Sequence, residues 1–226
     1  FRILPEAVFS IPELGTINLH ASLLPKYRGP APIQWALING DKETGLTTFR
    51  IDSGIDTGRI LLQKKISIAE NETAGELAVR MSESGAGLVL ETLDLIEKGD
   101  LEETVQDTSG LSKAPKITPD LMYINWSRPA EYIANLIRGL SPAVAARTNC
   151  GDTGYKIYRA APADIDHSAG NDKPGQIIKA DKNDGLVIST GSGSLKILEI
   201  QRQGKKVMEW QEFIRGMRLK VGDIFS

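Results

Sequence analysis

Residues that form disulfides or bind metals are scarce in this sequence. Its 226 residues include one cysteine, Cys150, and two histidines, His20 and His167. A single thiol excludes an internal disulfide and a thiolate metal cage, and no second histidine is placed to complete an imidazole-based metal site. We therefore expect no metal. His167 lies in a polar loop and is expected to be a bystander.

Long apolar runs are also missing. No segment approaches the ~18 consecutive apolar residues that span a bilayer, and residues 1–10 lack the basic flank and cleavage site of a signal peptide. We therefore expect no membrane partner and a location in the cytoplasm, which the scarcity of cysteine also fits. The first residue is Phe1 rather than methionine, so we expect an N-terminal stretch to precede it.

Neither sign of charge is in large excess, since the formal net charge is -2, but the two signs are unevenly distributed. Residues 1–112 contain 10 Lys and Arg against 17 Asp and Glu, whereas residues 113–226 contain 17 against 12. An acidic half joined to a basic half is compatible with a catalytic domain followed by a polyanion-binding domain. Ordinary solvated faces would produce the same split, so charge alone does not decide the function.

The first half of the chain alternates strand-like and helix-like segments, which indicates an α/β domain. Apolar, β-prone runs predict three strands, at residues 16–20, 45–51 and 59–68. Prolines that open a segment predict a helix at residues 31–38, and turn formers predict a loop at residues 52–58. A capping box formed by Thr73 and Glu76, followed by apolar residues at helical spacing, predicts a long helix that ends at Gly99.

The second half has a different texture. Residues 112–120 contain two prolines and two lysines and are the expected linker, and a helix is expected over residues 132–140. Five short β-prone runs follow, at residues 144–148, 155–160, 176–180, 186–190 and 195–201. Strands of this length and spacing are typical of a small barrel or sandwich. Gly191–Gly193 lacks the phosphate-loop pattern, so we interpret it as a hairpin turn.

Three polar residues could meet in one reaction centre. Asn18 and His20 lie two apart on the first predicted strand and so point to one face, and Asp56 lies in the glycine-flanked loop. These side chains suit acyl transfer to an amine: His20 can take the amine proton, Asn18 can stabilise the oxyanion, and Asp56 can support the imidazolium. Taken alone, a buried histidine beside an asparagine is more often a satisfied structural group, so the pattern leaves both interpretations open.

The surrounding residues carry a more specific signal. Asn18-Leu-His-Ala-Ser-Leu-Leu-Pro25, Tyr27-Arg-Gly29 and Gly54-Ile-Asp-Thr-Gly58 resemble, at the same separation, the active-site signature of the folate-dependent formyltransferases. The resemblance implies that Asn18, His20 and Asp56 are catalytic and that 10-formyltetrahydrofolate is the co-substrate. It further implies that short segments hold the folate through Leu4, Pro5, Ser22, Leu23, Leu24, Pro25, Asp52, Gly54 and Ile55.

Motifs in the second half narrow the family. Ile124-Asn-Trp126, Ile137-Arg-Gly-Leu-Ser-Pro142, Pro174-Gly-Gln176 and Gly204-Lys-Lys206 resemble the C-terminal domain of the methionyl-tRNA formyltransferase family, which is an OB-like barrel. The resemblance implies a formyltransferase Rossmann-like catalytic domain over residues 1–111, lacking its N-terminal portion. It implies a linker over residues 112–120 and an OB-like tRNA-binding domain over residues 121–226.

The resemblance also implies a reaction and its partners. A formyl group would pass from 10-formyltetrahydrofolate to the amino group of methionyl initiator tRNA, for translation initiation. The tRNA phosphates would face basic side chains, namely Lys113, Lys116, Lys205, Lys206, Arg215 and Arg218. We expect a monomer. Two alternatives stay open: a formyltransferase for a small amine such as an amino-sugar nucleotide, and a non-catalytic RNA-binding module in which the His20 loop is structural.

Overall fold

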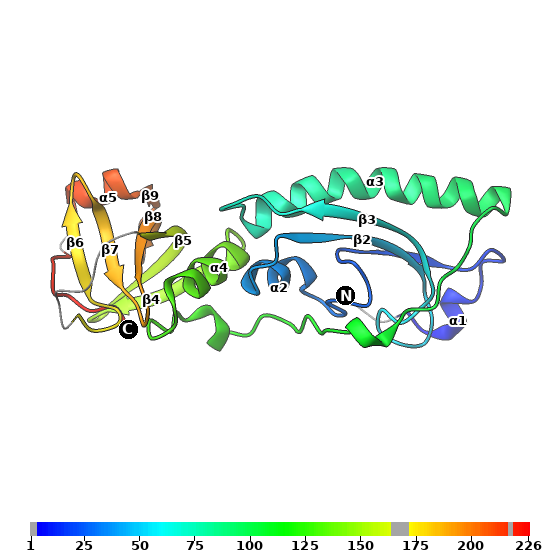
Figure 1. Cartoon of the computed structure of the whole chain (residues 1–226), viewed down its shortest axis with the longest axis horizontal. Helices are drawn as coiled ribbons and strands as arrows, with labels where there is room; N and C mark the ends of the chain where they lie inside the picture. Colours follow the sequence, from blue (N-terminus) through cyan, green and yellow to red (C-terminus); the bar gives the residue numbers. More distant parts are fainter. Residues whose placement is uncertain (1–3, 164–171, 217–218) are drawn as a thin grey trace. The chain divides into compact units, whose positions relative to one another are not determined.

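The computed structural model describes residues 4–163, 172–216 and 219–226, and the chain forms two compact units (Figure 1). The first unit comprises the residues up to Ala36, Asp41–Glu70 and Glu76–Lys116, and the second comprises Leu37–Gly40, Asn71–Gly75 and Ile117–Ser226. Two residues that the sequence analysis discusses, His167 and Arg218, lie outside the described residues. In the described part of the chain, no helix has the length and apolar character needed to cross a membrane.

The first unit contains a three-stranded antiparallel sheet. Its strands are β1 (Ile17–His20), β2 (Glu43–Arg50) and β3 (Ile60–Ser67), which lie side by side in that order. The register places Asn18 opposite Phe49 and His20 opposite Thr47. All three strands lie where the sequence predicts them, because β-branched and aromatic residues there are bounded by turn formers.

The helix α3 (Ala74–Lys98) runs along this sheet (Figure 1). Its buried side chains recur at spacings of four and seven residues and so share one face of the helix: Leu77, Met81, Leu88 and Thr92. The Thr92 hydroxyl lies 2.9 Å from the hydroxyl of Thr48 on β2, so a buried hydrogen bond joins helix and sheet. The helix starts directly after Thr73 and ends before Gly99, whose φ of 74° is the left-handed conformation of a glycine C-cap.

Shorter helices complete the first half of the chain. They are α1 (Glu6–Phe9), α2 (Pro32–Ile38) and the 3-10 helix η1 (Thr108–Gly110). The helix predicted at residues 31–38 from the preceding prolines is confirmed as α2. The single turn α1 was not predicted, because four residues are too few to show a helical period.

The second unit is built on one antiparallel sheet. Its strand order is β4 (Ala146–Cys150), β5 (Thr153–Ala163), β8 (Ser194–Arg202), β7 (Gly185–Ser189) and β6 (Ile177–Asp181), with β9 (Val207–Glu209) paired to β8. The core is aliphatic and fully buried at Ile157, Ile177, Leu186, Ile188 and Ile197. The five predicted strands and the OB-like architecture are confirmed. The strand β9 was missed because three residues cannot show an alternation.

Helices and the chain end flank this sheet. The 3-10 helix η2 (Asp120–Met122) and α4 (Ala130–Leu140) precede it, and α5 (Trp210–Gly216) follows β9. The ring of Trp126 stacks on that of Phe225 with centroids 5.9 Å apart, which ties the segment before α4 to the last residues of the chain. Gly191–Gly193 forms the turn between the antiparallel strands β7 and β8, so its interpretation as a hairpin turn is confirmed.

Candidate active site

His20 ends β1 and is buried, with one ring nitrogen already engaged. Its Nε2 lies 2.9 Å from the carbonyl oxygen of Tyr27. A carbonyl oxygen can only accept, so Nε2 carries the hydrogen and donates it. The other ring nitrogen, Nδ1, lies 3.7 Å from Oδ2 of Asp56. In the neutral ring, Nδ1 is therefore the nitrogen that can accept a proton, and it faces a carboxylate.

The loop after β1 is held so that the Tyr27 carbonyl meets His20. Tyr27 has a φ of 59°, a left-handed conformation that non-glycine residues rarely adopt. Its amide donates to the Ser112 hydroxyl at 2.9 Å, and its own hydroxyl donates to Oδ2 of Asp41 at 2.8 Å. Ser112 and Asp41 thus hold Tyr27 in place, and the Tyr27 carbonyl in turn determines the tautomer of His20.

Residues 112–114, which the sequence assigns to a linker, take part in this support. The amide of Arg28 donates to the carbonyl of Ser112 at 3.0 Å, and the amide of Ala114 donates to the carbonyl of Arg28 at 2.7 Å. A Cβ atom on Gly29 would lie 2.6 Å from the carbonyl oxygen of Ala114, so only glycine fits there. The start of the expected linker therefore packs against the candidate active site.

The segment Ser22–Pro25 is held by polar groups from the sheet. The Thr47 hydroxyl donates to the carbonyl of Ser22 at 2.7 Å and accepts from the amide of Leu24 at 3.1 Å. The carboxamide of Gln63 donates to the Leu24 carbonyl at 2.9 Å. The side chains of Ser22 and Leu24 are buried, so a ligand at this segment would reach its backbone and the more exposed residues Leu23 and Pro25.

The loop between β2 and β3 presents Asp56. Asp56 has a φ of 54°, and its Oδ2 accepts a hydrogen bond from the amide of Gly29 at 2.8 Å. Asp52 shapes the same loop, since its Oδ1 accepts from the amide of Gly54 at 3.0 Å and from the hydroxyl of Thr57 at 2.6 Å. These contacts hold the carboxylate beside Nδ1 of His20.

Two polar groups of the candidate trio have no hydrogen-bond partner in the described part of the chain. Within the described residues, neither Oδ1 of Asp56 nor the carboxamide of Asn18 forms a hydrogen bond. Asn18 is exposed on β1, whereas the side chain of Asp56 is 14% exposed. The structure thus brings the ring of His20 and the carboxylate of Asp56 together, and it presents the Asn18 carboxamide two residues before His20 on the same strand.

The structure places the other predicted folate contacts in two different settings. Asp52, Gly54 and Ile55 belong to the Asp56 loop and are exposed, with Ile55 60% exposed. Leu4 and Pro5 stand at the start of α1, where the Pro5 carbonyl accepts hydrogen bonds from the first helical turn. Among the described residues, no backbone hydrogen bond joins Leu4 or Pro5 to the His20 loop.

The five predicted tRNA-binding residues within the described part of the chain are exposed, and they are divided between the two units. Lys113 and Lys116 belong to the first unit. In the second unit, Lys205 and Lys206 lie in the turn between β8 and β9, and Arg215 lies on α5. Lys206 forms an exposed ion pair with Glu212 at 2.8 Å.

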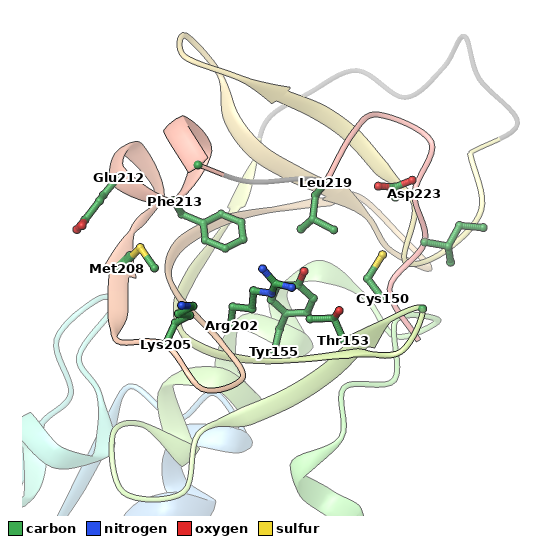
Figure 2. A pocket seen from close by; sticks show the side chains of 13 residues that line it. Cys150, Thr153, Tyr155, Arg202, Lys205, Met208, Glu212, Phe213, Leu219 and Asp223 are labelled. Atoms are coloured by element: carbon green, nitrogen blue, oxygen red, sulfur yellow. The ribbon is translucent and has the colours of Figure 1, made fainter.

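A cavity of about 620 Å³ opens beside Lys205 in the second unit (Figure 2). Its lining combines Arg202 with Tyr155, Phe213 and the single thiol Cys150. Burial raises the pKa of both the Cys150 thiol and the Tyr155 hydroxyl, so both groups are neutral at physiological pH. In the described part of the chain, no group of three acidic, histidine or cysteine residues could hold a metal ion.

Several residues that support the site lie outside the motifs of the sequence and were not predicted. Gln106 is buried and donates through Nε2 to the carbonyl oxygens of Asp56 and Gly58, at 3.0 Å and 2.8 Å. Thr47 and Gln63 hold the loop after β1. No local pattern signals such residues, because their role depends on partners far away in the sequence. Thr47 is one of three buried threonines on β2, and buried hydroxyl groups of this kind need hydrogen-bond partners.

Comparison with known proteins identifies the family of the chain. Residues 1–93 match the formyl transferase family, and residues 116–218 match the formyl transferase C-terminal domain. The methionyl-tRNA formyltransferases of Agathobacter rectalis and Thermodesulfovibrio yellowstonii are 42% and 48% identical to this chain, and each alignment covers 100% of this chain and 71% of the relative. The crystal structure of HypX from Aquifex aeolicus in complex with tetrahydrofolic acid shares the fold, with a TM-score of 0.70 and 19% identity over 99% of this chain and 40% of that chain.

The two matched domains and the fold define the chain as a formyl transferase with both the catalytic and the C-terminal domain. The sequence identity to relatives that align with the whole of this chain defines the family more narrowly. The chain belongs to the methionyl-tRNA formyltransferase family.

Proposed function

We propose that this chain transfers a formyl group from 10-formyltetrahydrofolate to the amino group of methionyl initiator tRNA, for translation initiation. The observation that carries the proposal is the pair of His20 Nδ1 and Asp56 Oδ2, 3.7 Å apart, in a chain 42% and 48% identical to enzymes of that name. The formyl transferase families that match both parts of the chain support the same reaction class.

The free groups of the site fit a formyl donor and an amine. The donor supplies an activated one-carbon formyl group, whose carbonyl oxygen needs a hydrogen-bond donor. The Asn18 carboxamide is such a donor, and it has no protein partner in the described structure. The exposed loop Asp52–Ile55 and the backbone of Ser22–Pro25 offer polar groups and the apolar side chain of Ile55 for the rest of the folate.

His20 manages the proton in the proposed reaction. As the methionyl nitrogen forms its bond to the formyl carbon, the nitrogen loses a proton to Nδ1 of His20. Nε2 keeps its hydrogen, which it donates to the Tyr27 carbonyl throughout. The ring is therefore a cation while Nδ1 carries the proton from the amine. Asp56 stabilises that cation across 3.7 Å, and Asn18 stabilises the oxyanion. The bond from the formyl carbon to the folate nitrogen then breaks, and the proton on His20 passes to that nitrogen.

Exposed basic residues would hold the tRNA backbone. Lys113 and Lys116 are exposed on the first unit, and Lys205, Lys206 and Arg215 supply positive charge on the second. Contacts of lysine and arginine with phosphates give affinity and orientation and make binding depend on salt. Residues 121–226 are accordingly assigned to tRNA binding and residues 1–111 to catalysis, with residues 112–120 joining them.

The enzyme is proposed to act as a monomer in the cytoplasm. The substrate, a charged initiator tRNA, is used there for translation, and each chain carries its own Asn18, His20 and Asp56. Light scattering of the purified protein, with and without tRNA, tests the oligomeric state. A stable dimer in both conditions would contradict that part of the proposal.

One assay separates this function from its two alternatives. The protein is incubated with 10-formyltetrahydrofolate labelled in the formyl group and with either methionyl initiator tRNA or a panel of amino-sugar nucleotides. Label on the tRNA supports the proposal. Label on a small amine alone supports a sugar-type formyltransferase, and tRNA binding without label transfer supports an RNA-binding module.

A further inference from the structure

We propose that Gln106 is a positioning residue for the formyl transfer. Gln106 holds Asp56 beside His20 and is itself oriented by Arg28. The inference rests on the catalytic role proposed above for Asp56. Gln106 lies outside the motifs that identify the active site, 50 residues from Asp56 in the sequence.

The carboxamide of Gln106 uses its full hydrogen-bonding capacity. Nε2 donates to the carbonyl oxygens of Asp56 at 3.0 Å and Gly58 at 2.8 Å. Oε1 accepts from Nε of Arg28 at 3.1 Å and from Nη2 of Arg28 at 2.5 Å. The residue is only 7% exposed, so water does not compete strongly for these bonds.

Arg28 fixes which way the carboxamide points. A guanidinium group only donates, so the amide oxygen must face Arg28 and the amide nitrogen must face the Asp56 loop. The reversed amide would place its hydrogens against the guanidinium and its oxygen against two carbonyl oxygens. Only one orientation is therefore compatible with these partners.

A closed chain of contacts joins Asp56 to Gln106, Arg28 and Gly29. Gln106 holds the main chain of Asp56, and the amide of Gly29 holds Oδ2 of its side chain at 2.8 Å. Gly29 directly follows Arg28, which Gln106 also binds. Asp56 is thus fixed at both its backbone and its carboxylate by one connected unit, in a left-handed conformation that an aspartate does not favour by itself.

The segment that carries Gln106 is itself anchored. The amide and carbonyl of Thr104 pair with those of Ile60 at the start of β3, at 2.9 Å and 2.8 Å. Ile60 follows the Asp56 loop by a few residues. Gln106 therefore reaches the loop from a segment that is hydrogen-bonded to the end of the same loop.

Two variants of Gln106 and one control test the inference. Gln106→Glu keeps the shape and the contact with Arg28 but points a carboxylate oxygen at the Asp56 and Gly58 carbonyls. Gln106→Met removes all four hydrogen bonds. Thr92→Val is the control, because it removes a buried hydroxyl from the same unit, at α3, without touching the Asp56 loop.

The readouts are kcat and KM for methionyl-tRNA, and hydrogen exchange of the Gly29 amide measured by NMR at constant pH. We expect Gln106→Glu to lower kcat by about 10- to 100-fold with KM changed by no more than about twofold, as for a misplaced catalytic group. The Gly29 amide should exchange several-fold faster, roughly in proportion to the loss of its bond to Asp56. Thr92→Val should change neither quantity.

Unchanged exchange at Gly29, or unchanged kcat in Gln106→Glu, overturns the inference. So does a Thr92→Val variant that loses as much kcat, because the effect is then general destabilisation. If Gln106→Met does not fold, Gln106→Glu and its exchange measurement still decide the matter. Faster exchange at Gly29, in a protein that transfers no formyl group to methionyl-tRNA, contradicts the proposed function but supports the positioning of Asp56.

Discussion

Nδ1 of His20 lies 3.7 Å from Oδ2 of Asp56, while Nε2 of the same ring donates to the Tyr27 carbonyl at 2.9 Å. The two contacts assign separate tasks to the two nitrogens. One is held by the protein and the other is left to exchange a proton with a substrate next to a carboxylate.

Removing the charge of Asp56 should slow the chemistry and spare substrate binding. Asp56→Asn keeps the shape of the side chain but no longer stabilises an imidazolium ion, so we expect kcat to fall by about 100-fold or more, with KM for methionyl-tRNA changed by no more than about threefold. Asp100→Asn, at an exposed aspartate after α3, is the matched control and should behave like the parent protein. A parallel loss of kcat and affinity in Asp56→Asn would contradict the assignment.

Two glycine substitutions should have opposite effects on stability. A Cβ at Gly58 would lie 1.6 Å from the carbonyl oxygen of Arg50, so Gly58→Ala must displace the Asp56 loop and should destabilise the protein by about 2 kcal/mol or more. Gly87 lies exposed inside α3 with nothing within 4 Å of its added Cβ, so Gly87→Ala should stabilise it by roughly 0.5–1 kcal/mol. Urea unfolding measures both. If Gly58→Ala has the same free energy of unfolding as the parent protein, the Asp56 loop tolerates displacement and the prediction is wrong.

Replacing a lysine that contacts a tRNA phosphate should weaken the salt dependence of tRNA binding. Lys113→Ala and Lys116→Ala should each reduce the slope of log Kd for tRNA against log salt concentration by roughly 0.7–0.9, the range per phosphate contact for single-stranded and duplex nucleic acid. Turnover at saturating tRNA should stay the same, because neither side chain is assigned to the chemistry. Lys98→Ala, at an exposed lysine that ends α3, is the control. An unchanged slope for both linker variants would remove these lysines from the proposed tRNA surface.

The single thiol should react slowly at neutral pH. Burial, with a further contribution from the Asp223 carboxylate, raises the pKa of Cys150, so its reactive thiolate is depleted below that pKa. Alkylation by iodoacetamide should therefore be slower than in the urea-unfolded chain, with a rate that keeps rising to higher pH. Equal rates in the folded and unfolded chains across pH 7 to about pH 9 would show that the thiol is not shielded.

The sequence was informative wherever one local segment determines the structure. Thr73 and Gly99 mark the two ends of α3, and β-prone runs bounded by turn formers mark the main strands of both sheets. The same holds for the candidate trio, since Asn18, His20 and Asp56 lie in short motifs that resemble a known signature.

Support from distant residues could not be predicted in this way. Gln106 lies 50 residues from Asp56, and Ser112 lies 85 residues from Tyr27, yet both hold the site. Their partners depend on how the strands and loops pack, which no period in the sequence encodes. Ser112 also lies in a proline- and lysine-containing stretch that reads as a linker, although residues 112–114 pair with the His20 loop.

The most direct test of the account is the single-turnover rate of formyl transfer to methionyl initiator tRNA by His20→Ala, measured together with its Kd for the tRNA. The account predicts a rate about 1,000-fold or more below that of the parent protein, with Kd changed by no more than about threefold, because His20 acts on the proton and not on tRNA binding. A rate close to that of the parent, or equal losses in rate and affinity, would contradict the role of His20 as the base.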